Sequence, residues 1–433
     1  MSLLNLLPFM ITLFGLYMLV RLRFFFIVNP IRTGKRALSV FRDSSSRKAL
    51  ALALAGTLGV GNIVGVAYGL SVGGAGSLFW IFISSFFSAV IKYAESSLAS
   101  YTRVESSAGG MAYVIKATFK GGGVLGAIYA LLCIMLSLTM GSALQAKSFT
   151  DSLGGTAKIP EYALSVLFVA LVLSVILGGV KKISKVTSRV IPLSTLVYVI
   201  ICLAVILKNI EKAPSVFVNI LSEAFDFRSI GGGVSSFLAM RGLKEGYARG
   251  LLSNEAGAGT SAMAESTSGD APADAGILGM IEVLFDTSLL CMLTGLAVLF
   301  SGVNISGLSG MEIVYSAFSF ALGKGAGVIL FFLVFSFAFS TVICWYYYGT
   351  ECIFFLFAKR HSAVYLAVFI TLMATGFLIP MNILISLSDY LLFFMSVITL
   401  ATLYKNSESI VLLSERCGLL KNSDSGKKLK SKT

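Results

Sequence analysis

The sequence predicts an all-α, polytopic membrane protein of about eleven transmembrane helices. Of its 433 residues, 56% are hydrophobic and only 13% are charged, whereas soluble proteins carry about 25% charged residues. Runs without any charge recur along the chain, among them Tyr162–Gly179, Val190–Leu207 and Ala363–Pro380. Each approaches the roughly 20 residues that a helix needs to cross a bilayer. A soluble core has no room for so many such runs, so we expect a chain embedded in lipid.

The first helix is expected at Leu3–Val20, which lacks the basic start and small-residue cleavage site of a signal peptide. Residues 1–48 therefore comprise a leading helix and a basic loop. A core at 49–404 follows, and residues 405–433 form a polar tail. The helices expected within the core are 50–73, 77–102, 122–150, 161–180, 188–208, 235–268, 275–301, 326–357, 362–380 and 382–404.

The distribution of positive charge agrees with this helix count. The net charge is +13, and the positive-inside rule places basic segments in the cytoplasm. The segments that the helix count places there are all basic: 21–48, 103–120, 181–189, 359–361 and the tail. The loops at 154–161 and 302–310, assigned outside, carry little positive charge. We therefore predict a multi-pass protein of the bacterial inner membrane, with the N-terminus outside and the C-terminus cytoplasmic, and no binding to nucleic acid.

Two glycine-rich polar runs interrupt the first and sixth helices of the core. The first break contains Gly59, Gly61 and Asn62, and the second contains Gly257 and Gly259. They occupy matching positions in two halves, 49–210 and 235–404, which indicates an inverted-repeat transporter with its site at the midplane. Unwound backbone survives at that depth only inside protein or against a wet cavity. Its N–H groups then face an anion, and its carbonyls coordinate sodium.

Other polar residues within the spans have weaker interpretations. The hydroxyls of Ser340 and Thr341 could complete an oxygen cage for sodium, or could bond the carbonyls of their own helix. Glu95 follows Lys92 and is expected at the cytoplasmic end in an ion pair. Asp286 and Asp389 are expected in structural pairs or at the interface. Six scattered cysteines and the single His361 suggest neither a metal site nor an enzyme.

Several motifs resemble the alanine or glycine:cation symporter family, of the sodium:alanine symporter type. The stretches that carry the resemblance are Gly59–Ala67, Gly73–Gly76, Lys92–Glu95, Gly109–Tyr113, Arg249–Gly259, Phe285–Thr287 and Phe339–Gly349. The most specific are S-N-E-A-G-x-G in the fifth of these and S-T-x-x-x-W-Y-Y-Y-G in the last. Two departures are Val60, where the family usually has threonine, and Ala75, where it often has proline.

The resemblance implies a LeuT-type 5+5 inverted repeat behind one extra N-terminal helix. It also implies sodium-coupled uptake of alanine or glycine, with no cofactor beyond the sodium ion. Carried over by residue, the cargo carboxylate meets N–H groups near Val60 and Gly61. The residues expected to hold the amino group and side chain are Leu252, Ser253, Asn254 and Gly257. The residues expected to hold sodium are Ala55, Leu58, Ser340 and Thr341.

Three alternative functions each require a different feature of the sequence. A proton-coupled amino-acid permease of the same fold needs a titrating carboxylate, for which Glu255 is the candidate. A channel needs a continuous polar lining, but the sequence shows two polar breaks with apolar flanks. A membrane enzyme needs clustered histidine, cysteine or carboxylate residues, which the sequence lacks.

Overall fold

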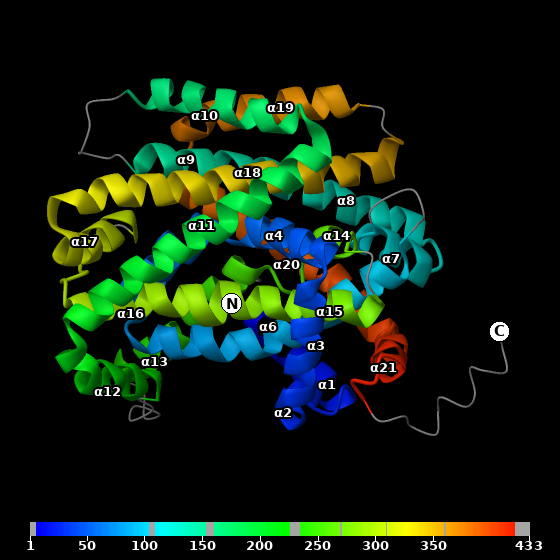
Figure 1. The fold of residues 1–433 in the computed structure, drawn as a ribbon, viewed down its shortest axis with the longest axis horizontal. Helices are drawn as coiled ribbons and strands as arrows, with labels where there is room; N and C mark the ends of the chain where they lie inside the picture. The colour runs from blue at the N-terminus through cyan, green and yellow to red at the C-terminus, as the bar shows by residue number, and fades with distance from the viewer. Residues whose placement is uncertain are drawn as a thin grey trace.

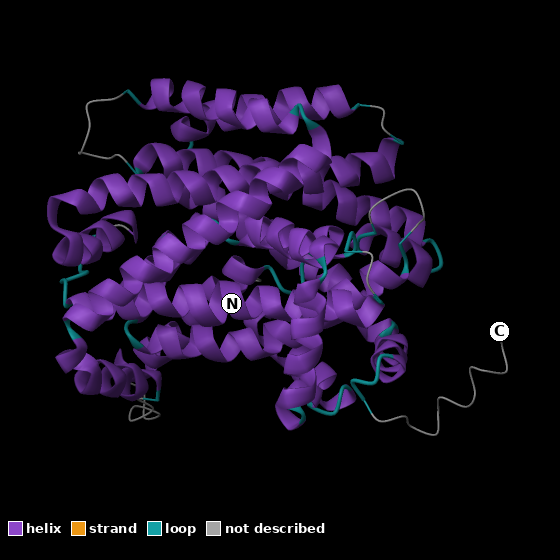
Figure 2. Ribbon diagram, viewed as in Figure 1, coloured by secondary structure: helices purple, strands orange, loops and turns teal. Residues whose placement is uncertain are grey.

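Every regular element in the described residues is a helix (Figure 2). The computed structural model describes residues 6–103, 109–152, 160–225, 234–268, 271–308, 310–358 and 361–420, with the side chains of 234–240 and 324 excepted. Six helices or helix series among them are long and apolar enough to cross a membrane: α6 (Gly76–Tyr101), α8 to α9 (Gly122–Asp151), α11 (Gly179–Lys208), α15 to α16 (Pro272–Ser301), α18 (Ala326–Phe357) and α20 (Met381–Lys405).

A seventh candidate span is a bent pair, in which α4 (Ser44–Thr57) meets α5 (Val64–Gly73) through the short turn η2 (Val60–Asn62) at an angle of 65°. Shorter apolar helices are α1 (Leu6–Arg21), α10 (Glu161–Ile176), α17 (Gly310–Leu322) and α19 with its last turn (Ser362–Leu378). The polytopic character is thus confirmed, with at least six spans, while the count of eleven remains a prediction.

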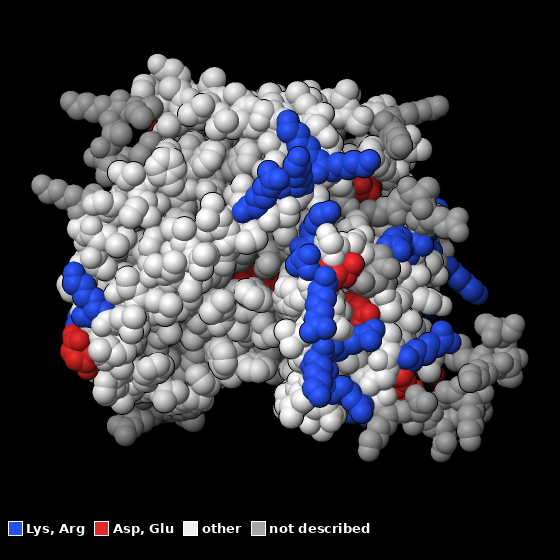
Figure 3. Space-filling model, in the orientation of Figure 1, with Lys and Arg blue, Asp and Glu red and all other residues white. Residues whose placement is uncertain are grey.

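Five helices that hydropathy did not predict connect or flank the spans. They are α3 (Pro30–Arg42), α7 (Met111–Thr118), α12 (Ala213–Ala224), α17 and α21 (Ser407–Arg416). Four of them are short or amphipathic, so they contain no long apolar run from which hydropathy could predict a helix. The basic segment that we expected as a loop folds in part as α3. In Figure 3, lysine and arginine side chains gather along α3 and near the start of α11, whose Lys181, Lys182 and Arg189 are exposed.

The most extensive contacts among the described helices are those that α6 makes with α15 and with α13 (Val234–Asn254). Glycines permit the closest of these contacts. A Cβ on Gly276 would lie 2.8 Å from the Tyr93 carbonyl oxygen, and one on Gly279 would lie 2.9 Å from that of Lys92. The backbones of α6 and α15 approach so closely at these glycines that no larger side chain fits between them.

Helices α10 and α19 pack together along one edge (Figure 1). The long helix α11 crosses in front of α18, and both of them contact α4 (Figure 1). Large apolar side chains on this rim are open, including Leu193 and Leu207 of α11, each 64% exposed. Apolar side chains on the outside and a packed polar interior suit a chain with lipid around it.

Candidate functional site

The first break lies where α4 stops. The N–H of Gly59 donates to the Thr57 carbonyl (2.7 Å) and not to Ala55, four residues back. This leaves the carbonyl of Ala55 without its helical partner. The neighbouring carbonyl of Gly56 accepts from the Trp345 Nε1 of α18 (3.2 Å). The predicted glycines thus lie at a true interruption of the helix, inside the protein.

The second break lies between Asn254, the last residue of α13, and α14 (Ala262–Glu265). Gly257 and Gly259 have φ of +92° and +73°, a left-handed conformation that glycine adopts without steric cost. The Asn254 Oδ1 accepts from the N–H of Ala256 (3.0 Å) and so caps part of the unwound chain. The sequence pattern and the geometry therefore place both interruptions at the same residues.

Asp286 joins the two breaks. Its Oδ1 accepts from Asn62 Nδ2 of the first break (2.6 Å), and its Oδ2 accepts from Ser253 Oγ of the second (2.6 Å). Thr287 Oγ1 donates to the same Oδ2 (2.8 Å) and accepts from Asn254 Nδ2 (2.9 Å). Asp286 and these four partners are all at most 3% exposed. The carboxyl group of Asp286 thus accepts hydrogen bonds from three side chains in this interior.

Two of the predicted sodium residues meet across the first break. Thr341 Oγ1, from the middle of α18, donates to the Leu58 carbonyl (3.2 Å). Ser340 is fully buried beside it, but its hydroxyl bonds the carbonyls of Ser336 (2.8 Å) and Phe337 (3.0 Å) in its own helix. Ser340 thus bonds carbonyls of its own helix, Thr341 reaches the first break, and the sodium role of both residues stays a prediction.

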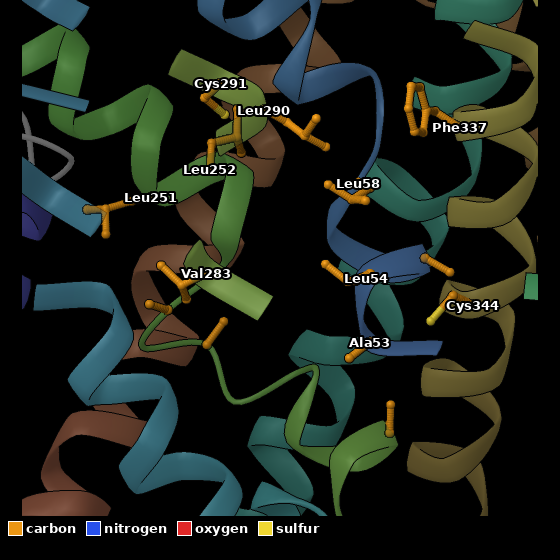
Figure 4. Close-up of a cluster of buried hydrophobic side chains, with 14 of the residues drawn as sticks. Ala53, Leu54, Leu58, Leu251, Leu252, Val283, Leu290, Cys291, Phe337 and Cys344 are labelled. Atoms are coloured by element: carbon orange, nitrogen blue, oxygen red, sulfur yellow. The ribbon is translucent and has the colours of Figure 1, made fainter. Parts of the chain in front are cut away.

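A narrow hollow, too small for a water molecule, lies beside the first break. It is lined by Leu58, Gly59, Asn62, Ile63, Tyr198, Leu290 and Phe337. Figure 4 shows Leu58 on the first break facing the helix that carries Leu252, with Phe337 approaching from α18. A Cβ on Gly61 would meet nothing within 4 Å, so space adjoins that residue.

None of the six predicted cargo residues is among those that line this hollow. The N–H of Val60 points to Gln145 Oε1 (3.4 Å). Leu252 lines a second pocket, between α13, α1 and α20. A Cβ on Gly257 would meet Ile11 and Ser396, from the same two helices. Ser253 and Asn254 are the second-break residues that the structure brings to the first break, through Asp286.

Sequence reasoning misplaced two sets of carboxylates. Lys92 and Glu95 were expected at the cytoplasmic end as a pair, but both are fully buried, and Lys92 pairs with Glu282 (3.2 Å). Asp286 was given only a structural role, although it contacts both breaks. No local signal could have corrected either interpretation, because the partners are separated by 190 and 224 residues.

The residues at and between the two breaks therefore offer three kinds of group. Neutral oxygens of Leu58 and Thr341 suit a sodium ion, backbone N–H groups near Gly61 suit a carboxylate, and the Asp286 carboxylate suits an ammonium group. A zwitterion and a monovalent cation satisfy all three.

Comparisons with known proteins show the family of the chain. Residues 1–417 match the sodium:alanine symporter family. The chain is 34% identical to an uncharacterized transporter of Haemophilus influenzae, over 87% of this chain and 85% of the relative. It is 29% identical to the sodium/alanine symporter AgcS of Methanococcus maripaludis, over 89% and 88%. It is 30% identical to the sodium/proton-dependent alanine carrier protein of Bacillus sp. (strain PS3), over 77% and 78%.

Solved structures show the fold. MhsT in complex with L-phenylalanine matches with a TM-score of 0.56 and 13% identity, over 88% of this chain and 93% of that one. A manganese transporter mutant of Eremococcus coleocola matches with a TM-score of 0.55 and 16% identity, over 88% and 82%. Both neighbours have the LeuT-type fold, and at this identity the likeness concerns the fold alone.

Proposed function

The chain belongs to the sodium:alanine symporter family, and from this premise we propose that it carries a small neutral amino acid, alanine or glycine, into the cell together with sodium. Transport proceeds by alternating access, in which one helical bundle rocks against the other. The observation that carries the proposal is the hydrogen bond between Thr341 and the Leu58 carbonyl at the first break. The protein lies in the bacterial inner membrane with its C-terminus in the cytoplasm.

Sodium binds to oxygens alone. The carbonyls of Ala55 and Leu58 and the hydroxyls of Ser340 and Thr341 supply four uncharged ligands, which a hard monovalent cation prefers. All four residues are at most 1% exposed, so water reaches the ion only when the bundle opens. Sodium therefore enters and leaves its site only when the first break becomes accessible to water.

The cargo lies across the two breaks. Its carboxylate meets the N–H groups near Val60 and Gly61, at the start of a half-helix where the dipole favours an anion. Its ammonium group lies near Ser253 and Asn254, with Asp286 as the counter-charge. Asp286 contacts both breaks, so the distance between them is short. This short distance favours a cargo amino acid with a small side chain.

The driving force is sufficient. One charge that moves through about 100 mV yields about 2.3 kcal/mol, which supports roughly 40-fold accumulation at about 1.4 kcal/mol per tenfold. The sodium concentration gradient adds to this figure. No chemical step is required, so the protein acts as a carrier and not as an enzyme.

Uptake into proteoliposomes tests the proposal. Purified protein is reconstituted, and labelled alanine and glycine are supplied with an inward gradient of sodium or of choline, with protein-free liposomes as the control. We expect accumulation with sodium and only equilibration with choline. Equal uptake in the two salts would refute sodium coupling, and competition by a panel of L- and D-amino acids identifies the preferred cargo.

A further inference from the structure

Five ionisable side chains are buried together behind the second break, away from the hollow. Lys92 and Glu95 come from α6, Glu255 and Glu265 from the second break and α14, and Glu282 from α15. We call these five residues the acid cluster. Each of them is at most 1% exposed. With every group ionised, four carboxylates against one ammonium would leave a net charge of −3.

The single cation is already engaged. Lys92 Nζ lies 3.2 Å from Glu282 Oε2 and also donates to Ser261 Oγ (2.5 Å). Because burial of an unpaired charge is far more costly than burial of its neutral form, the remaining carboxylates cannot all stay ionised. A buried carboxyl group in this position takes up a proton.

Hydrogen bonding leads to the same conclusion. Hydroxyl groups reach two of the glutamates: Ser96 donates to Glu265, and Thr260 donates to Glu255 (2.5 Å). Several carboxyl oxygens have no partner among the described residues: both of Glu95 and one each of Glu255, Glu265 and Glu282. An ionised carboxylate only accepts, whereas a protonated one donates. Added protons therefore convert surplus acceptors into donors.

A metal ion fits the acid cluster less well than protons do. No set of three histidine, cysteine or carboxylate residues in the described chain is arranged to hold a metal. The Lys92 ammonium, which lies within the cluster, repels a further cation. Glu95 is the member with the most unsatisfied oxygens, because both of its carboxyl oxygens lack a partner among the described residues.

A pocket lies beside the acid cluster. It lies between α1, α13 and α20 and is lined by Leu7, Pro8, Ala248, Leu251, Leu252, Glu255, Ala256, Asp389, Leu392 and Ser396. Its volume of about 50 Å³ exceeds the roughly 10–15 Å³ that one water needs. The side chain of Asp389, 24% exposed, lies 3.8 Å from Arg249. Glu255 belongs both to the pocket wall and to the acid cluster.

We propose that the acid cluster is a proton-binding site, filled and emptied through this pocket by way of Glu255. The charged groups that face it are its own five members, Asp286 one turn beyond Glu282, and Asp389 with Arg249 along the pocket. The site contains none of the four proposed sodium ligands, and Glu255 adjoins the proposed cargo residue Asn254. It is present whether or not alanine is the cargo.

The first test counts bound protons on purified protein, so it stands even if sodium-coupled uptake fails. Infrared difference spectra and potentiometric titration are recorded for wild type, Glu95→Gln and the matched control Glu161→Gln at the exposed start of α10. We expect Glu95→Gln to lose part of the protonated-carboxyl carbonyl band and to release about one proton fewer per molecule. The control should match wild type. If Glu95→Gln does not fold, Glu265→Gln serves in its place.

The second test concerns the route. Proton release after a pH jump is followed by stopped flow with a pH-sensitive dye in wild type and Asp389→Asn. We expect slower release with an unchanged number of protons, because the variant removes the carboxylate at the pocket mouth. An unchanged rate would overturn the pocket as the route. If Glu95→Gln showed the same protonated-carboxyl band and released the same number of protons as wild type, the acid cluster would not be a proton-binding site.

Discussion

Replacement of Thr341 by valine tests the sodium site most directly. Valine keeps the shape of threonine and removes one hydroxyl, which in the structure lies 3.2 Å from the Leu58 carbonyl oxygen. That hydroxyl is one of four proposed ligands. The loss of a hydrogen-bond type contact to a charged group costs about 1.5–3 kcal/mol. At about 1.4 kcal/mol per tenfold, the half-saturating sodium concentration rises about 10- to 150-fold.

The assay is sodium-dependent alanine uptake in proteoliposomes at a fixed alanine concentration. Thr341→Ser, which retains the hydroxyl, should stay close to wild type. Thr350→Val is the matched control, because Thr350 lies on the same helix and bonds only the carbonyl of Tyr346 in its own helix (2.7 Å). A sodium half-saturation for Thr341→Val that equals those of Thr341→Ser and Thr350→Val would refute the placement of sodium at the first break.

Three further variants test the interior. Asp286→Asn keeps the shape of the side chain but removes the counter-charge, so alanine should compete at least tenfold more weakly in binding assays; equal competition would contradict the ammonium site. Lys92→Met leaves the carboxylate of Glu282 buried without its cation, at a cost of about 3–5 kcal/mol in stability, and the Lys92→Met/Glu282→Gln double variant should recover part of the melting temperature. Gly279→Ala forces its Cβ to 2.9 Å from a backbone oxygen of α6 and should cost about 1–3 kcal/mol, whereas Gly123→Ala, with open space around it, should melt like wild type.

Hydropathy predicted the long spans well because each is a continuous apolar run. The helix expected at 326–357 has the bounds of α18, and that expected at 77–102 differs from α6 by one residue. Short helices such as α7 and α12 could not be found in this way, because they do not need to cross the bilayer. The basic stretch that forms α3 shows the same limit, since its pattern is amphipathic and not apolar.

The two breaks were visible in the sequence because glycine is costly inside a helix. What the sequence could not show is which side chains from other spans meet there. Asp286 acquires its role from Asn62 and Ser253, which become neighbours only after folding. Lys92 shows the opposite error, because the acid nearest in sequence, Glu95, was taken as its partner in place of Glu282.

The glycine contact between α6 and α15 has a consequence for how the molecule responds to movement. Two helices that touch at their backbones cannot slide or tilt independently, so Lys92, Glu95 and Glu282 keep fixed mutual distances. Glu255 and Glu265 belong instead to the interrupted segment. Any shift of that segment changes the distances from Glu255 and Glu265 to the fixed ion pair of Lys92 and Glu282. Movement of the interrupted segment can thus lead the acid cluster to bind or release a proton.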